Sequence, residues 1–163
     1  MTQQNPAIEK LASLIKDIQV AMLTTEAENG VLRSRPMVTQ HRPFDGTLWF
    51  FTGAKSPKAH EIQDHQQVNL SYADPGKDHY VSVSGRASIV HDMAKVKEMW
   101  NPIYMAWFPQ GVDDPDLSLM KVQVEQAEYW DPGSSRMVQL AGFVKAMVTG
   151  EPVKGGESKK ITL

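Results

Sequence analysis

The chain has no cysteine among its 163 residues, which excludes disulfide bonds, thiolate metal sites and cysteine nucleophiles. It also lacks an excess of charge, since 17 Lys and Arg are balanced by 19 Asp and Glu, for a formal net charge of -2. No strong overall field therefore attracts nucleic acid or an anionic membrane. Any site for an anion has to be local.

Long apolar runs are missing as well. Residues 1–5 are polar, no basic region is followed by an apolar stretch, and no uncharged run approaches membrane-spanning length. We therefore expect a cytoplasmic protein without a membrane partner. The length fits one domain with a real core, which we place at residues 1–152, and we expect the Gly- and Lys-containing segment 153–163 to be a mobile tail.

Several familiar catalytic motifs are absent. Neither the glycine spacing of a P-loop nor a dinucleotide-binding Gly-x-Gly-x-x-Gly occurs, which argues against nucleoside triphosphate chemistry, and no Gly-x-Ser-x-Gly supports an esterase. His60 and His65 are five positions apart, which turns them about 140° from each other on a helix. We expect no metal site.

The most informative segment that is present runs from Phe51 to Ile62, where an apolar strand leads into a helix start that carries lysines and a hydroxyl. Pro57 suits the first helical turn and Ser56 can cap it, so free backbone N–H groups and the positive helix end favour an anion near Lys58. A capped helix with solvated lysines is the alternative, and the local sequence leaves it open.

A second cationic segment, Arg33 to Met37, lies on a predicted neighbouring strand. Strand alternation sends Arg33 and Arg35 to the same face, and Arg35 offers a planar fork of donors suited to phosphate. An isolated arginine is most often an ordinary surface residue. Two such elements converging would suit a phosphorylated cofactor.

Periodicity and turn residues predict a mainly β, α+β chain, a small antiparallel barrel of six strands decorated with helices, because closure removes exposed edges. Gly85 is expected to mark a bulge or bend in its strand, and residues 101–116 to form a long ordered loop. Trp107 in that loop and Trp130 at a strand end could line a cofactor pocket, although tryptophan is more often a core residue. We expect strands over residues 20–25, 32–40, 47–52, 68–73, 80–90 and within 117–130, and helices over 6–18, 57–65, 93–100 and 137–148.

Four motifs together resemble the pyridoxamine phosphate oxidase-like flavoproteins, within them the general stress protein branch. They are Arg-Ser-Arg-Pro-Met at 33–37, Trp-Phe-Phe-Thr at 49–52, Lys-Ser-Pro-Lys-Ala-His at 55–60 and Glu-Tyr-Trp-Asp at 128–131. The similarity covers about residues 8–150. It implies a six-stranded split barrel with flanking helices, a homodimer, and FMN bound in clefts between the subunits, with Trp107 approaching from the partner subunit. The positions that it implies for the cofactor are Arg35, Pro36, Met37, Val38, Phe51, Thr52, Ser56, Lys58, Tyr80, Trp107 and Trp130.

The chain also departs from this family. Relatives that oxidise pyridoxamine phosphate carry an arginine pattern beyond the turn after Trp130 and end in Arg-Leu-Ala-Pro, whereas here Arg136 is followed by a predicted helix and that ending is absent. Oxidation of pyridoxamine phosphate is therefore not expected.

We predict an FMN-dependent oxidoreductase with NAD(P)H or a small oxidisable molecule as second substrate. No catalytic residue is assigned, since the flavin supplies the reactivity. A flavin-binding or flavin-buffering stress protein without turnover is the alternative, and a deazaflavin could replace FMN. A nucleic-acid-binding barrel is disfavoured because the aromatic residues lack an interleaved basic stripe.

Overall fold

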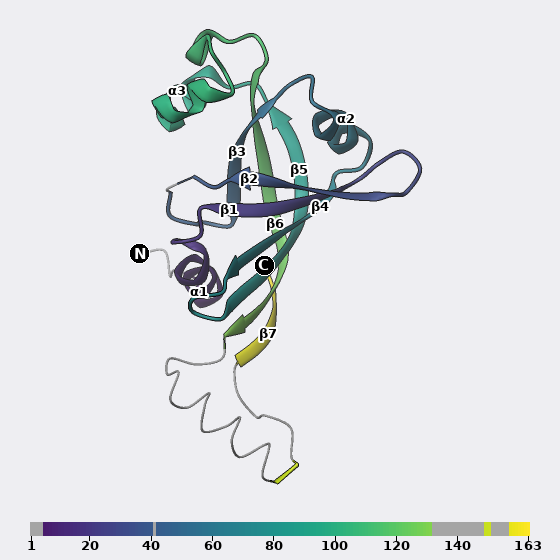
Figure 1. Cartoon of the computed structure of the whole chain (residues 1–163), viewed down its shortest axis with the longest axis vertical. Helices are drawn as coiled ribbons and strands as arrows, with labels where there is room; N and C mark the ends of the chain where they lie inside the picture. Colours follow the sequence, from purple (N-terminus) through teal and green to yellow (C-terminus); the bar gives the residue numbers. More distant parts are fainter. Residues whose placement is uncertain (1–4, 41, 132–148, 151–156) are drawn as a thin grey trace.

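The computed structural model describes residues 5–40, 42–131, 149–150 and 157–163, and Figure 1 shows a curved sheet with helices at both ends. Helices α2 and α3 lie towards one end, and α1 lies towards the other. The elements in chain order are α1 (Pro6–Ile15), β1 (Val20–Glu26), β2 (Leu32–Val38), β3 (Thr47–Gly53), α2 (Pro57–Asp64), β4 (Gln67–Asp74), β5 (His79–Val90), α3 (Met93–Met99), the 3-10 helices η1 (Pro102–Ala106) and η2 (Gly111–Asp113), β6 (Leu117–Asp131) and β7 (Glu157–Thr162).

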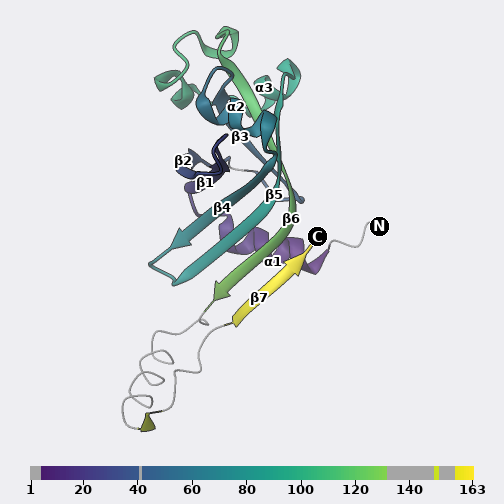
Figure 2. The same ribbon diagram turned by 90° about the vertical axis from the view of Figure 1, so that its right-hand side faces the viewer.

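All strand pairs in the described part of the chain are antiparallel, in the order β2-β1-β4-β5-β6-β3, and β7 also pairs with β6. The long strand β6 carries β5 on one edge and, on the other, β3 along its first half and β7 along its second half. Figure 2 shows β4, β5, β6 and β7 side by side. No ladder joins β2 to β3 in the described residues, so the six-strand path stays open as a split barrel, as the family resemblance implies.

The core forms between α1 and the inner face of the sheet. Asn5 caps α1 by accepting a hydrogen bond from the Ala7 N–H (3.0 Å), with Pro6 as the first helical residue, which confirms the predicted helix start. Leu11 and Leu14 of this helix are buried in the same cluster as Leu70 of β4. Alternate burial along β4 and β1 places one side-chain row of each strand in this core.

The predicted irregularity at Gly85 is confirmed. The pairing of β5 with β6 shifts register between Ser84 and Gly85. A Cβ atom at Gly85 would overlap the carbonyl oxygen of Gln123 and lie 3.0 Å from its carbonyl carbon. Only glycine allows β6 to approach so closely, and this bulge bends the central pair of strands.

The second half of the segment 153–163, which we expect to be a mobile tail, contains strand β7. Strand β7 pairs with β6 from Gln126 to Asp131, and Ile161 packs against the core cluster. This pairing is possible because β3 pairs only with the first half of β6 and leaves the edge of its second half open. The helix predicted over 137–148, like Arg136, lies outside the described residues. No helix in the described part of the chain is long and apolar enough to cross a membrane.

Candidate functional site

A pocket of about 450 Å³ lies between β2, β3, the start of α2 and the η1 segment. Its volume is within the range of small-molecule binding sites, and its walls are mainly apolar and aromatic with a few polar groups, as such sites usually are. The lining residues are Val20, Pro36, Met37, Val38, Phe51, Thr52, Gly53, Lys58, Tyr104, Trp107, Phe108 and Asp116.

Thr52 gives the pocket an unsatisfied polar group. The residue is 2% exposed, and its Oγ1 atom is buried without a hydrogen-bond partner among the described residues. Leaving a buried hydroxyl unpaired costs about 1–3 kcal/mol, so native proteins seldom retain one without a reason. A polar ligand atom in the pocket would remove this cost, which makes Thr52 fit a bound cofactor.

Lys58 lines the same pocket and is partly buried. Burial lowers the pKa of its ammonium group below the usual 10.5, the positive charge of Arg35 lowers it further, and the carboxylate of Asp116 opposes both effects. The charge of Arg35, from the second predicted cationic segment, thus acts on Lys58 of the first. Both side chains therefore contribute positive charge to this site.

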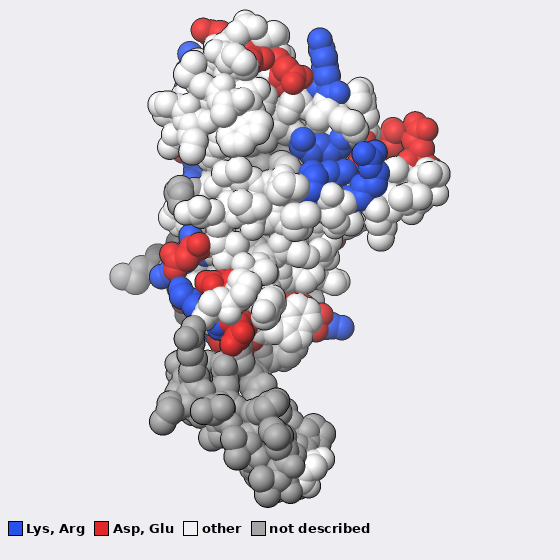
Figure 3. Space-filling view, viewed as in Figure 1, with Lys and Arg blue, Asp and Glu red and all other residues white. Residues whose placement is uncertain are grey.

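Arg35 is held by a polar cluster on the flank of this site. Its guanidinium donates to Glu61 Oε2 (3.0 Å) and to the hydroxyl of Thr25, which in turn donates to Glu61, and Arg33 donates to Glu61 Oε1 (3.1 Å). The Thr25 hydrogen bond and then the charges of Arg35 and Arg33 lower the pKa of Glu61, while burial acts in the opposite direction. Figure 3 shows Lys and Arg side chains gathered beside α2 and the β1–β2 hairpin.

The turn before α2 differs from the sequence prediction. Its backbone N–H groups are not free: Ala54 donates to the carbonyl oxygen of Asp116 (2.7 Å), Lys55 to Asp116 Oδ1 (3.0 Å), and Ser56 to the carbonyl oxygen of Gly53 (3.1 Å). Ser56 occupies the N-cap position, but its hydroxyl donates to Gly53 (2.7 Å) and does not cap the helix. These three N–H groups of the turn are therefore bonded within the chain, and Ser56 is an N-cap without a capping side-chain hydrogen bond.

The structure brings most predicted cofactor residues together. Those that line the pocket are Pro36, Met37, Val38, Phe51, Thr52, Lys58 and Trp107. Arg35 does not line the pocket but its charge acts on Lys58, and Ser56 lies in the turn that leads to Lys58. Trp107, for which the resemblance implies an approach from a partner subunit, lines the pocket of its own chain.

Tyr80 and Trp130 lie elsewhere. They pair with each other at one end of β5 and β6, whereas Thr52 pairs with Ser118 at the opposite end of β6. Twelve residues of strand separate Ser118 from Trp130, which corresponds to roughly 40 Å at about 3.3 Å per residue. Within a single chain, Tyr80 and Trp130 therefore lie far from the pocket.

Sequence reasoning missed part of the pocket wall. Tyr104 packs on Phe51 with ring centroids 4.7 Å apart, and its hydroxyl accepts a hydrogen bond from Gln40 (2.7 Å). Asp116 was also missed, because no local pattern marks it. It reaches the site because β3 pairs with β6 up to Gly53.

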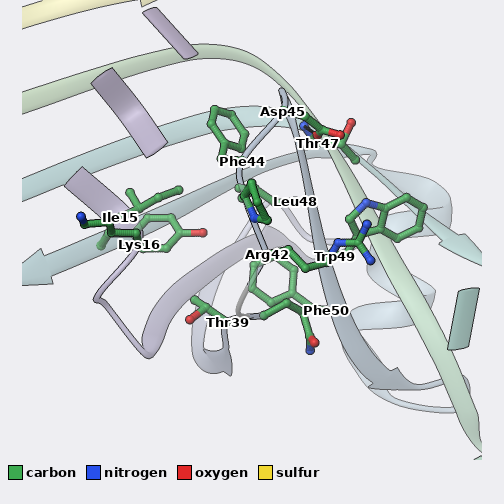
Figure 4. A pocket seen from close by; sticks show the side chains of 13 residues that line it. Ile15, Lys16, Thr39, Arg42, Phe44, Asp45, Thr47, Leu48, Trp49 and Phe50 are labelled. Carbon is green, nitrogen blue, oxygen red and sulfur yellow. Dashed lines mark hydrogen bonds between the residues drawn. The ribbon is translucent and has the colours of Figure 1, made fainter. Parts of the chain in front are cut away.

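A smaller hollow lies on another part of β3, shown in Figure 4. It has a volume of about 50 Å³ and is lined by apolar side chains such as Ile15, Phe44 and Leu48, with Arg42 among the polar ones. Tyr72 also lines it, and burial raises the pKa of its hydroxyl far above the ordinary value, so this group stays neutral. The hollow has room for a water molecule or two but not for a cofactor.

Comparisons with known proteins agree with this geometry. A sequence model described as "Pyridoxamine 5'-phosphate oxidase like" matches residues 6–154. The chain belongs to the pyridoxamine 5'-phosphate oxidase-like family. Within that family it resembles general stress protein 26 of Bacillus subtilis, with 29% identity over 136 residues that cover 81% of this chain and 94% of the relative.

Two solved structures extend the comparison for this member of the pyridoxamine 5'-phosphate oxidase-like family. A general stress protein 26 structure from Jannaschia sp. CCS1 has a TM-score of 0.78 at 24% identity and covers 97% of this chain and 99% of its own; it confirms the split-barrel fold. The general stress FMN/FAD binding protein of Xanthomonas citri has a TM-score of 0.69 at 28% identity, with 80% of this chain and 93% of its own covered. The predicted family and branch are thus confirmed.

Proposed function

We propose that this protein binds FMN in the pocket between β2, β3, α2 and η1, and acts as an FMN-dependent oxidoreductase. The buried hydroxyl of Thr52 supports this most directly, since it lacks a partner in a pocket that also contains Lys58. The flavin-binding relative from Xanthomonas citri gives additional support.

Each part of the site suits one part of the cofactor. Lys58 would hold the phosphate with Arg35 at its flank, and Glu61 would keep the Arg35 guanidinium oriented. Phe51 and Trp107 would flank the flat ring system, and Thr52 would hydrogen-bond to a polar cofactor atom. When bound, the flavin supplies hydride and electron transfer, and the chain contributes binding, orientation and exclusion of water.

We expect Arg35→Ala and Lys58→Ala each to weaken FMN binding by about 1.5–3 kcal/mol, the range for hydrogen bonds to charged groups. Titration calorimetry or flavin fluorescence measures the affinity. An absorption spectrum of the freshly purified protein, with flavin bands in the visible region, tests the same proposal without a variant. Unchanged FMN affinity in both variants would contradict the assignment of these residues.

Lys58→Arg is the matched control for the charge of the lysine. Because burial and Arg35 lower the pKa of Lys58, the wild type should lose FMN affinity at alkaline pH before an ordinary lysine would deprotonate. The arginine variant keeps its charge throughout this range and should not show that loss.

We also infer a homodimer in which Tyr80 and Trp130 of one subunit approach the pocket of the other. Both side chains are exposed (41% and 42%) and lie far along the strands from their own pocket, while Val20 and Val38 expose apolar surface at the pocket rim.

We expect Trp130→Ala to weaken FMN binding three- to tenfold, about 0.7–1.4 kcal/mol, even though the residue is remote in its own chain. Sedimentation measures the dimer; a monomer whose FMN affinity does not respond to this change would refute the arrangement.

A flavin-binding stress protein without turnover would use the same pocket. Anaerobic mixing of the FMN-loaded protein with NADPH or NADH separates the two functions. Rapid bleaching of the flavin bands supports the oxidoreductase, and sluggish reduction supports a binding protein.

A further inference from the structure

Asp116 places a negative charge inside a pocket that is otherwise cationic at this end. It lines the pocket together with Lys58, and its charge acts directly on the Lys58 ammonium group. No motif of the sequence and none of the expected cofactor contacts accounts for it. A carboxylate at this position works against the binding of a second anion.

The position of the carboxylate is fixed by the backbone. Asp116 Oδ1 accepts from the Lys55 N–H (3.0 Å), the Asp116 N–H donates to Asp114 Oδ1 (3.0 Å), and a Cβ atom at Gly53 would lie only 2.6 Å from Asp116 Oδ2. The Asp116 carbonyl oxygen also accepts from Ala54 (2.7 Å). The carboxylate therefore takes the place at the turn before α2 that an anionic ligand would otherwise occupy.

We propose that Asp116 is an internal anion that competes with the phosphate of the ligand, and so sets how strongly the pocket prefers phosphorylated over unphosphorylated ligands. The inference rests on the proposed function of this pocket. Arg33, Arg35 and Lys58 supply three positive charges, of which Glu61 and Asp116 offset two. A phosphate dianion then meets a site that is only weakly cationic, whereas a flavin without phosphate, riboflavin, carries no charge to this end of the pocket.

Asp116→Asn tests this proposal because asparagine keeps an acceptor for the Lys55 N–H and removes only the charge. FMN should bind about three- to tenfold more tightly to the variant, as expected for removal of a like charge at the edge of a protein. Riboflavin affinity should not change. Asp113→Asn is the matched control, since Asp113 is exposed in the same loop and does not line the pocket.

An unchanged or lower ratio of FMN to riboflavin affinity in a folded Asp116→Asn protein would overturn the proposal. Asp116→Ser, which also offers a neutral oxygen acceptor, provides a second variant if the first does not fold. Inorganic phosphate, added alone in a thermal unfolding experiment, should stabilise the variant more than the wild type. If the wild type binds neither flavin, the proposed function fails, and the phosphate experiment still decides whether Asp116 competes for the anion site.

Discussion

Replacement of Gly85 by alanine is expected to destabilise the fold by about 3–5 kcal/mol, at the upper end of single-residue effects. The added Cβ atom would overlap the Gln123 carbonyl oxygen and stand 3.1 Å from the Cα atom of Val124. Both neighbours are backbone atoms of β6, which is paired on both sides of the bulge. A side chain could rotate away, but this ladder cannot move without breaking hydrogen bonds.

Urea unfolding followed by tryptophan fluorescence measures this loss. Gly76→Ala is the matched control, because a Cβ atom there meets only a side-chain oxygen of Asp74 at 3.4 Å. The free energy of unfolding of this control should be close to that of the wild type. A loss of less than about 1 kcal/mol for Gly85→Ala would mean that β5 and β6 separate easily at the bulge, contrary to the close packing described.

The second large effect is expected at Glu61, whose side chain is only 9% exposed. Glu61→Ala leaves the Arg35 guanidinium, 21% exposed, and the buried Thr25 hydroxyl without their shared acceptor. Removing one partner of such a buried pair lowers the free energy of unfolding by about 3–5 kcal/mol. Because Arg33, the other partner of Glu61, is exposed, we expect a loss near the lower value. The free energy of unfolding at neutral pH measures it.

The pH dependence gives this prediction a further test. The folded-state pKa of Glu61 is lowered below 4.5, so its contribution to stability is present above that pH and is lost as the pH falls through the lower, folded-state value. The difference between wild type and Glu61→Ala should therefore shrink in acid. Asp17→Ala, which breaks an ion pair with Lys77 that is well exposed on both sides, should change stability little at either pH.

The sequence predicted the elements whose signals are local. Asn5 and Asp92 both cap the helices expected after them, and the glycine in β5 marks the expected bulge. The two cationic segments could be recognised because each carries its own pattern, and the order of the motifs pointed to the family. Their meeting at Lys58 and Arg35 follows from the fold.

Other features depend on contacts between distant segments. Glu61 gives no sequence signal for its role, because its partners Thr25 and Arg35 come from a hairpin more than twenty residues away. Asp116 reaches the turn before α2 only through the pairing of β3 with β6. Strand β7 was obscured by a polar, glycine-containing composition, although Ile161 anchors it. In this segment the backbone hydrogen bonds with β6 outweigh the low strand propensity of the polar residues.

Strand β7 has a practical consequence for handling the protein. Its ladder with β6 extends to Thr162, and the Leu163 N–H donates to the Glu125 carbonyl oxygen (2.9 Å). A purification tag fused directly after Leu163 would begin beside this hydrogen-bonded edge. Removing residues 157–163 would uncover β6 backbone that could recruit strands from neighbouring molecules. A tag should therefore not be fused directly after Leu163.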